Sequence, residues 1–281
     1  MAVNIQQIKD LREATNAGMG ACKEALIATN GNMEEAIKYL REKGLAVQAK
    51  RVDKESKQGM IGLASAADGS ALALAEINCE TDFVANTDGF KDFVKNASNV
   101  ALEGKDIAAT LEDEYKMLLV KTGENVKIRR TERYVLEGTG LLSGYIHMGG
   151  KIGVLVELAC AKAETAASQE AIDLAHMLCL HIAANAPKYI AAGEIPQSEI
   201  DEELEVKLNA LKEQKGKLPP EQALEGIKKG MVNKFASQIC LLKQNYVADD
   251  KQTVEAVIAA VAKQMGDEIT VKRFARLQLG A

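Results

Sequence analysis

The chain has 281 residues, 47% hydrophobic and 27% charged, a balance typical of a globular protein with two or three domains. Its net charge of −5 disfavours a general nucleic-acid-binding protein, which needs a basic face, and no apolar run reaches membrane-spanning length. We therefore expect neither nucleic acid nor a membrane as a partner. The five cysteines are scattered and odd in number, and the N-terminus turns polar at once. Both features predict a cytoplasmic protein with reduced thiols and no signal peptide.

Residues 1–45 are predicted to form a small domain of short helices. Ile5, Ile8 and Leu11 recur at helical spacing, and Asn32 is placed to cap a later helix with acidic residues in its first turn. Gly44 is expected to end that helix. Residues 46–58 are polar and partly basic, and we interpret them as a solvated linker.

A first core subdomain is predicted at 59–140. The Asp68-Gly69 pair between two extended runs is a strong hairpin signal. Helices are expected at 87–103 and 106–122, followed by a strand at 123–130.

The stretch Thr81-Asp82-Phe83-Val84 lies where the second strand of this hairpin leads into a helix. From its residue type and position, Phe83 has two interpretations. It is either an ordinary core residue or a side chain displayed on a short connection, where binding residues are common.

The same pattern returns later in the chain. Gly149-Gly150 separates two extended runs, and the closing segment from Ile269 matches the one from Val126, with Arg129-Arg130 opposite Lys272-Arg273. The sequence therefore predicts an α+β fold with a two-part core, in which a unit of hairpin, helices and closing strand is repeated. The second subdomain is assigned to 141–197 and 233–281.

Residues 198–232 form the insertion that separates those two pieces. Leucines and isoleucines recur there at helical spacing on either side of Pro219-Pro220, which cannot lie inside a helix. We expect an antiparallel coiled-coil arm. Such an arm is typical of an interaction surface, here a homodimer contact, and the alternative is a packed arm without a partner.

The sequence lacks several kinds of catalytic and binding chemistry. His176, Cys179 and His181 are close in sequence, but His181 points away from the other two on a helix, so no metal site is expected. Residues 144–151 resemble a phosphate-binding loop but are one residue too long and lie in a hairpin. We expect no catalytic residues and no cofactor, which favours a protein that acts on another protein.

Several motifs identify a family in combination. They are residues 11–19 (LREATNAGM), 22–26 (CKEAL), 78–85 (NCETDFVA), 123–130 (GENVKIRR), 151–156 (KIGVLV, with His147 nearby) and 181–184 (HIAA). In this order they resemble the bacterial translation elongation factor Ts family across nearly the whole chain.

The resemblance implies a nucleotide exchange factor that is not an enzyme. Members of the family promote GDP release from elongation factor Tu, so GDP-bound and nucleotide-free elongation factor Tu are the implied partners. The family's fold is a ubiquitin-associated-like helical domain, a two-part core and a coiled-coil arm.

The resemblance also assigns contacts. It implies that Phe83 wedges between side chains of the partner near its Mg²⁺ site, with Asp82 helping to hold that contact and Thr81 and Val84 completing the motif. A displayed Phe83 is thereby favoured over a core residue. Further implied contacts to the partner are Arg12, Met19, Lys23, His147 and Val247.

Two other functions stay open. One is a structural binding partner or holdase of a GTPase, without exchange activity. The other is a small-molecule enzyme, which would need a polar pocket with a perturbed catalytic group, and the sequence nominates none.

Overall fold

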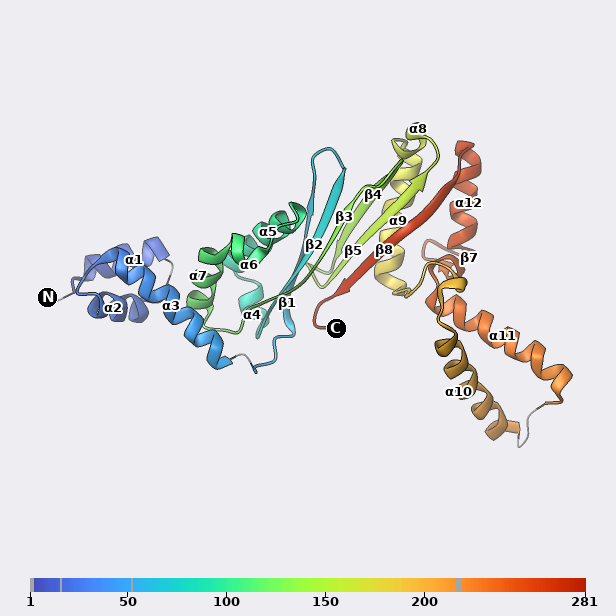
Figure 1. Ribbon diagram of the computed structural model, residues 1–281, viewed down its shortest axis with the longest axis horizontal. Helices are drawn as coiled ribbons and strands as arrows, with labels where there is room; N and C mark the ends of the chain where they lie inside the picture. The colour runs from blue at the N-terminus through green and yellow to red at the C-terminus, as the bar shows by residue number, and fades with distance from the viewer. Residues whose placement is uncertain (1–2, 16, 52, 216–218) are drawn as a thin grey trace. The chain divides into compact units, whose positions relative to one another are not determined.

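The computed structural model describes residues 3–15, 17–51, 53–215 and 219–281 (Figure 1). The chain divides into two compact units. The first comprises Met1–Val135, Gly144–Leu155 and Leu277–Ala281, and the second comprises Leu136–Ser143 and Val156–Arg276.

The N-terminal part of the first unit contains the helices α1 (Ile5–Thr15), α2 (Met19–Ala28) and α3 (Met33–Arg51). Their apolar stripes meet in a small core that includes Ile8, Leu11, Leu26 and Leu40. The Asn32 side chain accepts a hydrogen bond from the Glu35 N–H at the start of α3, as a capping residue should. The helical character predicted for this region is confirmed.

The predicted end of α3 at Gly44 is wrong, because α3 continues to Arg51. Gly44 lies against α7 (Glu112–Thr122), where an added Cβ would come within 2.6 Å of Val120 Cγ2. This glycine therefore allows two helices to approach closely instead of ending one of them.

The segment at 46–58, expected to be a solvated linker, is helical up to Arg51. Val52 lies outside the described residues. Further on, the Lys54 carbonyl accepts a hydrogen bond from the Asn125 side chain, and the Ser56 hydroxyl donates one to the Asn125 carbonyl. These bonds attach the segment to the core.

The first sheet has the strand order β1-β2-β3 and is antiparallel. Its strands are β1 (Gln58–Ser65), β2 (Ala71–Cys79) and β3 (Lys127–Val135). The predicted hairpin is confirmed, with Gly69 at φ +72° in the turn. The predicted strand at 123–130 begins only at Lys127.

All nine residues of β2 are buried because both faces of this central strand are covered. On one face, α5 (Asp88–Leu102) packs Phe93, Val94 and Ala97 into the same apolar cluster as Ile77. On the other face, residues 144–155 of the same unit approach closely. A Cβ added at Gly153 would meet Ile61 and Leu74.

Three further helices accompany α5: α4 (Asp82–Ala85), α6 (Ile107–Thr110) and α7. The single helix predicted at 106–122 is interrupted at Leu111, whose φ of −107° and ψ of +29° lie outside the helical region. α7 then ends at Gly123, which adopts the left-handed conformation that favours glycine.

The second sheet has the order β4-β5-β8, with β4 (Gly140–His147), β5 (Ile152–Cys160) and β8 (Ile269–Gln278). Between β5 and β8, the chain first forms α8 (Ala163–Ala166) and α9 (Gln169–Asn185). The remaining elements outside the arm are the 3-10 turns η1 (Ala192–Glu194) and η2 (Leu241–Lys243), the short strands β6 (Asn245–Tyr246) and β7 (Asp249–Thr253), and α12 (Val254–Met265).

Equivalent positions in the two sheets carry the same buried ion pair. On β2, Glu76 is fully buried and lies 2.6 Å from Nε of Arg130 on β3. On β5, Glu157 is 1% exposed and lies 2.6 Å from Nε of Arg273 on β8. Each pair joins a middle strand to its closing strand, so the two copies share side-chain chemistry as well as element order.

The inserted segment consists of α10 (Gln197–Lys215) and α11 (Glu221–Ile239), which contact each other (Figure 1). Part of the predicted arm, residues 216–218, lies outside the described residues. α11 extends beyond the predicted boundary at 232, and its end packs Ala236 against Ile195 and Cys240. Across the described residues, no helix combines the length and apolar character that a membrane span needs.

Candidate partner-binding site

Phe83 is displayed on the surface of the first unit. Its side chain is 83% exposed on the single helical turn α4, between the buried strand β2 and α5. Phe90 and Phe93, which follow on α5, are both buried in the core. The interpretation of Phe83 as a core residue is therefore wrong.

Local hydrogen bonds fix this turn at both ends. Thr81 is the N-cap of α4, and its hydroxyl accepts the Val84 N–H at 3.3 Å. The Asp82 carbonyl accepts a bond from the Asn86 side chain at 2.9 Å, and the Thr87 hydroxyl donates to the Val84 carbonyl at 2.8 Å. Val84 is half-buried against the core, whereas Asp82 is exposed. The turn thus presents Phe83 and Asp82 outward from a held backbone.

The thiol of Cys79 lies beneath the turn and donates to the Thr81 carbonyl at 3.1 Å. Burial, and then the nearby charge of Glu124, raise the pKa of Cys79 to about 12. All five cysteines of the chain are free and buried. Since the thiolate is the reactive form, Cys79 is held as an unreactive part of the core.

A second group of predicted contacts lies on the N-terminal helices. Arg12 is exposed on the last turn of α1, and Met19 and Lys23 are exposed one helical turn apart on α2. Ile27, one turn further, is 57% exposed and is a further candidate contact that the sequence motifs do not include. Ile27 lies four residues after Lys23, and this spacing indicates from sequence alone that the two residues share one face of the helix. Met19, Lys23 and Ile27 therefore lie on one exposed face of α2.

His147 is the last residue of β4 and is half-buried. Its Nδ1 lies 2.9 Å from the Tyr145 hydroxyl, a hydrogen bond that orients the ring. The next residue, Met148, is 64% exposed with φ +50° and is a further candidate contact that the sequence motifs do not include.

Val247 lies in the second unit, between β6 and β7, and is 45% exposed. Its N–H donates to Nδ1 of the fully buried His181 at 3.2 Å. His181 Nε2 lies 2.9 Å from the Gln244 side-chain oxygen, and burial lowers the pKa of His181. This histidine therefore belongs to a buried polar network that holds the backbone of Val247.

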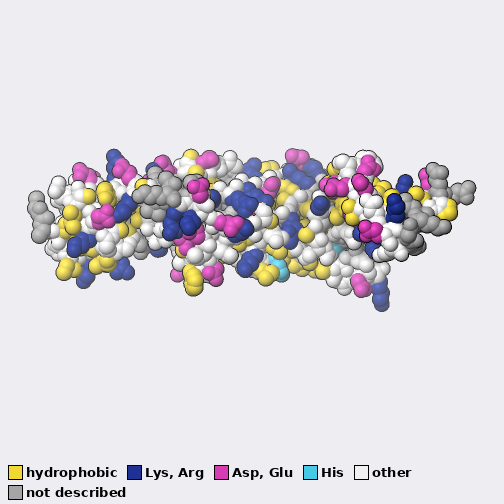
Figure 2. Space-filling view, turned by 90° about the horizontal axis from the view of Figure 1, so that it is seen from below, with side chains coloured by type: hydrophobic (Ala, Val, Ile, Leu, Met, Phe, Trp, Pro, Cys, Tyr) yellow, Lys and Arg dark blue, Asp and Glu magenta, His cyan; other side chains and the backbone are white. Residues whose placement is uncertain are grey.

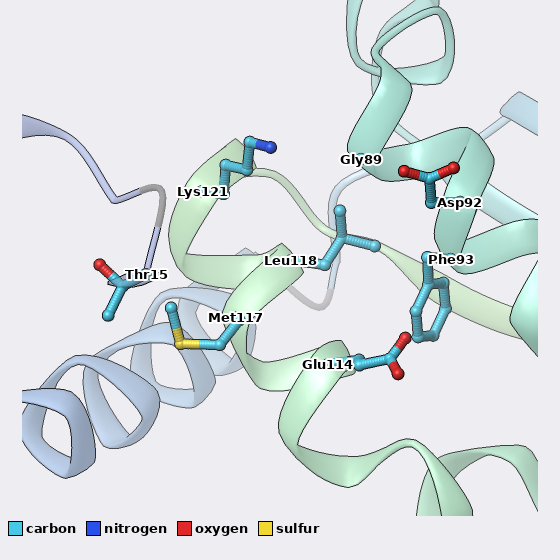
Figure 3. Close-up of a pocket in the computed structure, with 8 residues that line it drawn as sticks. All are labelled: Thr15, Gly89, Asp92, Phe93, Glu114, Met117, Leu118 and Lys121. Atoms are coloured by element: carbon cyan, nitrogen blue, oxygen red, sulfur yellow. The ribbon is translucent and has the colours of Figure 1, made fainter. Parts of the chain in front are cut away.

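A pocket of about 190 Å³ lies between α5 and α7 of the first unit, with Thr15 at its edge (Figure 3). Asp92, Glu114 and Lys121 line it together with apolar side chains. None of its lining residues is a predicted contact, so the pocket does not coincide with the partner-binding residues. Figure 2 shows acidic and basic side chains interspersed on one face of the molecule, with hydrophobic side chains exposed at several places.

Comparison with known proteins shows what the chain is similar to. Residues 80–281 match the family described as Elongation factor TS. The chain is 40% identical to elongation factor Ts of Trichlorobacter lovleyi, in an alignment that covers 100% of this chain and 93% of the relative. The chain belongs to the elongation factor Ts family.

Other relatives match the chain over nearly their full length. Elongation factor Ts of Desulfovibrio desulfuricans is 39% identical, with 100% of this chain and 99% of the relative covered. Elongation factor Ts of Clostridium perfringens is 35% identical, with 99% and 93% covered. A member of this family is a translation factor and not an enzyme. The chain itself has a mixed α+β fold with N-terminal helices and antiparallel sheets.

Proposed function

We propose that this chain is a cytoplasmic guanine-nucleotide exchange factor that promotes GDP release from elongation factor Tu during translation elongation, with Phe83 as the wedge. The observation that carries the wedge is the 83% exposure of Phe83 on a capped, core-anchored turn. An aromatic ring in this position gains most by entering a pocket on another protein, since burial of a large apolar side chain is favourable by about 1.5–3 kcal/mol.

The physical basis is linkage between two ligands of one partner. This chain binds nucleotide-free elongation factor Tu more tightly than the GDP-bound form. By linkage, the chain lowers the affinity of elongation factor Tu for GDP by the same ratio by which GDP lowers its affinity for the chain. Phe83 fits only the distorted nucleotide site, and its insertion disturbs the Mg²⁺ that neutralises the phosphates. GDP then dissociates, and GTP binding releases the factor.

The other predicted contacts extend this surface. Arg12, Met19 and Lys23 would contact the partner's nucleotide domain, and His147 and Val247 would contact another domain. Asp82 would support the wedge contact. The proposal includes a ubiquitin-associated-like domain at 1–45, core subdomains at 59–140 and at 141–197 with 233–281, and a coiled-coil arm at 198–232 that forms a homodimer.

The test is release of fluorescent GDP from purified elongation factor Tu, followed by stopped flow. The wild-type chain is expected to accelerate release strongly, and Phe83→Ala is expected to lose most of that acceleration. Ile172→Ala, which truncates another exposed apolar side chain on α9, is the matched control and should behave as the wild type.

The outcomes separate the alternatives. A wild-type chain that binds elongation factor Tu without accelerating GDP release would be a structural partner or holdase. If Phe83→Ala accelerates release as well as the wild type, the chain exchanges nucleotide without this wedge.

A further inference from the structure

Two chain segments that are far apart in sequence meet beneath the Phe83 turn. One is the connection between β2 and α4, at Glu80 and Thr81, and the other is the loop between α7 and β3, at Glu124 and Asn125. The Glu124 carboxylate accepts the N–H groups of Glu80 and Thr81 at 3.0 and 3.1 Å. It also accepts the Thr81 hydroxyl at 2.6 Å.

The Thr81 hydroxyl links this carboxylate to the helix cap. A hydroxyl has one proton to donate, and here that proton goes to Glu124. Its lone pairs are then free to accept the Val84 N–H, which is the capping bond of α4. Removal of Glu124 would therefore free both the backbone before the turn and the group that caps it.

The contact is reciprocal. Glu80 accepts the Asn125 N–H at 2.7 Å and pairs with Arg51, at the end of α3, also at 2.7 Å. Burial alone would raise the pKa of Glu80, but the Asn125 N–H and then Arg51 outweigh it, so that this pKa lies below its ordinary value. Two carboxylates thus each accept backbone N–H groups from the opposite segment. We call these four residues, Glu80, Thr81, Glu124 and Asn125, the clamp.

The turn needs such support because it is short. A helix of four residues makes too few backbone bonds to offset the entropy of fixing its dihedrals. A wedge on an unsupported turn would have to be ordered during binding, which weakens the interaction that it makes. Charge-assisted bonds to a carboxylate are about twice as strong as neutral ones.

The second unit contains a natural counterpart without a wedge. Asp267 follows the left-handed Gly266 as Glu124 follows Gly123, and it accepts the Lys162 N–H at 3.0 Å before α8. Glu164 occupies the place of Phe83 on that turn. A carboxylate before the closing strand is therefore a feature of both copies, but only the first copy presents an aromatic side chain.

We propose that Glu124 is a positioning residue for nucleotide exchange, which holds the Phe83 turn in the orientation that enters the partner. This rests on the proposed function of Phe83. In this role Glu124 acts through its hydrogen bonds to Glu80 and Thr81 and needs no contact with nucleotide or Mg²⁺.

The first test uses the free chain and needs no partner. Amide hydrogen exchange at Glu80, Thr81 and Val84 should be slow in the wild type and at least about tenfold faster in Glu124→Ala, because their acceptors are lost or loosened. Asp267→Ala, the matched control, should leave these amides protected. Unchanged protection in Glu124→Ala would overturn the proposal.

The second test is a double-mutant cycle on GDP release. Glu124→Ala should lower the maximal release rate at saturating factor by about tenfold, equivalent to about 1.4 kcal/mol, with a smaller change in the half-saturating concentration. Glu124→Gln keeps an oxygen for the backbone N–H groups and should recover part of the rate. Added to Phe83→Ala, Glu124→Ala should cause little further loss, whereas Asp267→Ala should have no effect on its own.

The possible results distinguish this inference from the function on which it rests. If Phe83→Ala is defective while Glu124→Ala exchanges normally, only the role of Glu124 is wrong. If the losses from Phe83→Ala and Glu124→Ala simply add, Glu124 acts by another route and the proposal fails. If Phe83→Ala is fully active, the wedge itself is wrong, and the proposal for Glu124 fails with it.

Discussion

Replacement of Gly44 by alanine tests whether α3 packs closely on α7. An added Cβ would lie 2.6 Å from Val120 Cγ2 and 2.9 Å from the Lys116 carbonyl oxygen, and Cβ contacts under 3.0 Å are essentially never observed. The carbonyl belongs to the backbone and cannot rotate away, so the two helices would have to move apart.

The expected magnitude follows from two opposing effects. Alanine is favoured over glycine inside a helix by about 1 kcal/mol, whereas overpacking costs about 1–3 kcal/mol. Since one of the two clashes is with backbone, we expect the upper part of that range and a net destabilisation of about 1–2 kcal/mol for Gly44→Ala.

The control makes the same chemical change in open space. Gly230, on α11, has nothing within 4 Å of an added Cβ, so Gly230→Ala should stabilise by about 0.5–1 kcal/mol. Urea denaturation followed by circular dichroism, with hydrogen exchange of residues 33–51, would measure both variants. If Gly44→Ala stabilises the chain as Gly230→Ala does, the close packing of α3 on α7 is wrong.

Three further predictions concern the core and the buried ionisable groups. Phe90→Ala should destabilise the chain by about 3–5 kcal/mol because Phe90 is fully buried, whereas Phe83→Ala should change stability little; both are measured by denaturant unfolding. Burial raises the pKa values of Cys79 and Cys179 to about 12, so neither thiol should react with iodoacetamide at neutral pH until the chain is unfolded, as peptide mass spectrometry would show. Burial lowers the pKa of His181 in the folded chain. As the pH falls below about 6.5, His181 is therefore protonated in the unfolded chain before it is protonated in the folded chain. The free energy of unfolding should therefore decrease as the pH falls from that value through the folded pKa, and His181→Gln should flatten this part of the profile.

The hairpins could be predicted from sequence because their signal is local. Asp68-Gly69 supplies a glycine with positive φ at the turn, and Asp68 accepts the Ser70 N–H, so a few neighbouring residues determine the geometry. The same holds for the turn at Gly149-Gly150, where both glycines have positive φ.

Gly44 shows where local reasoning fails. A glycine near the end of an apolar helical pattern is typical of a helix terminus, and Gly123 is such a case. At Gly44 the glycine instead permits contact with Lys116 and Val120 of α7, which lie 72 and 76 residues later in the chain. Nothing near Gly44 in sequence distinguishes these two uses.

The candidate site was predictable only in part, for a related reason. The sequence shows the motif around Phe83, but the exposure of Phe83 depends on which neighbouring side chains fill the core, and Phe90 and Phe93 fill it. Glu124 lies in a recognisable motif, but its role cannot be predicted from its neighbours in sequence, because its hydrogen-bond partners Glu80 and Thr81 are 44 and 43 residues away.

The central claim is that Phe83 couples binding of this chain to loss of GDP from elongation factor Tu. The most direct measurement is the dissociation constant of the chain for GDP-bound and for nucleotide-free elongation factor Tu, with the wild type and Phe83→Ala. We expect the wild type to bind the nucleotide-free form much more tightly, and Phe83→Ala to lose most of this preference while it still binds the GDP-bound form. An unchanged ratio of the two constants in Phe83→Ala would contradict the claim.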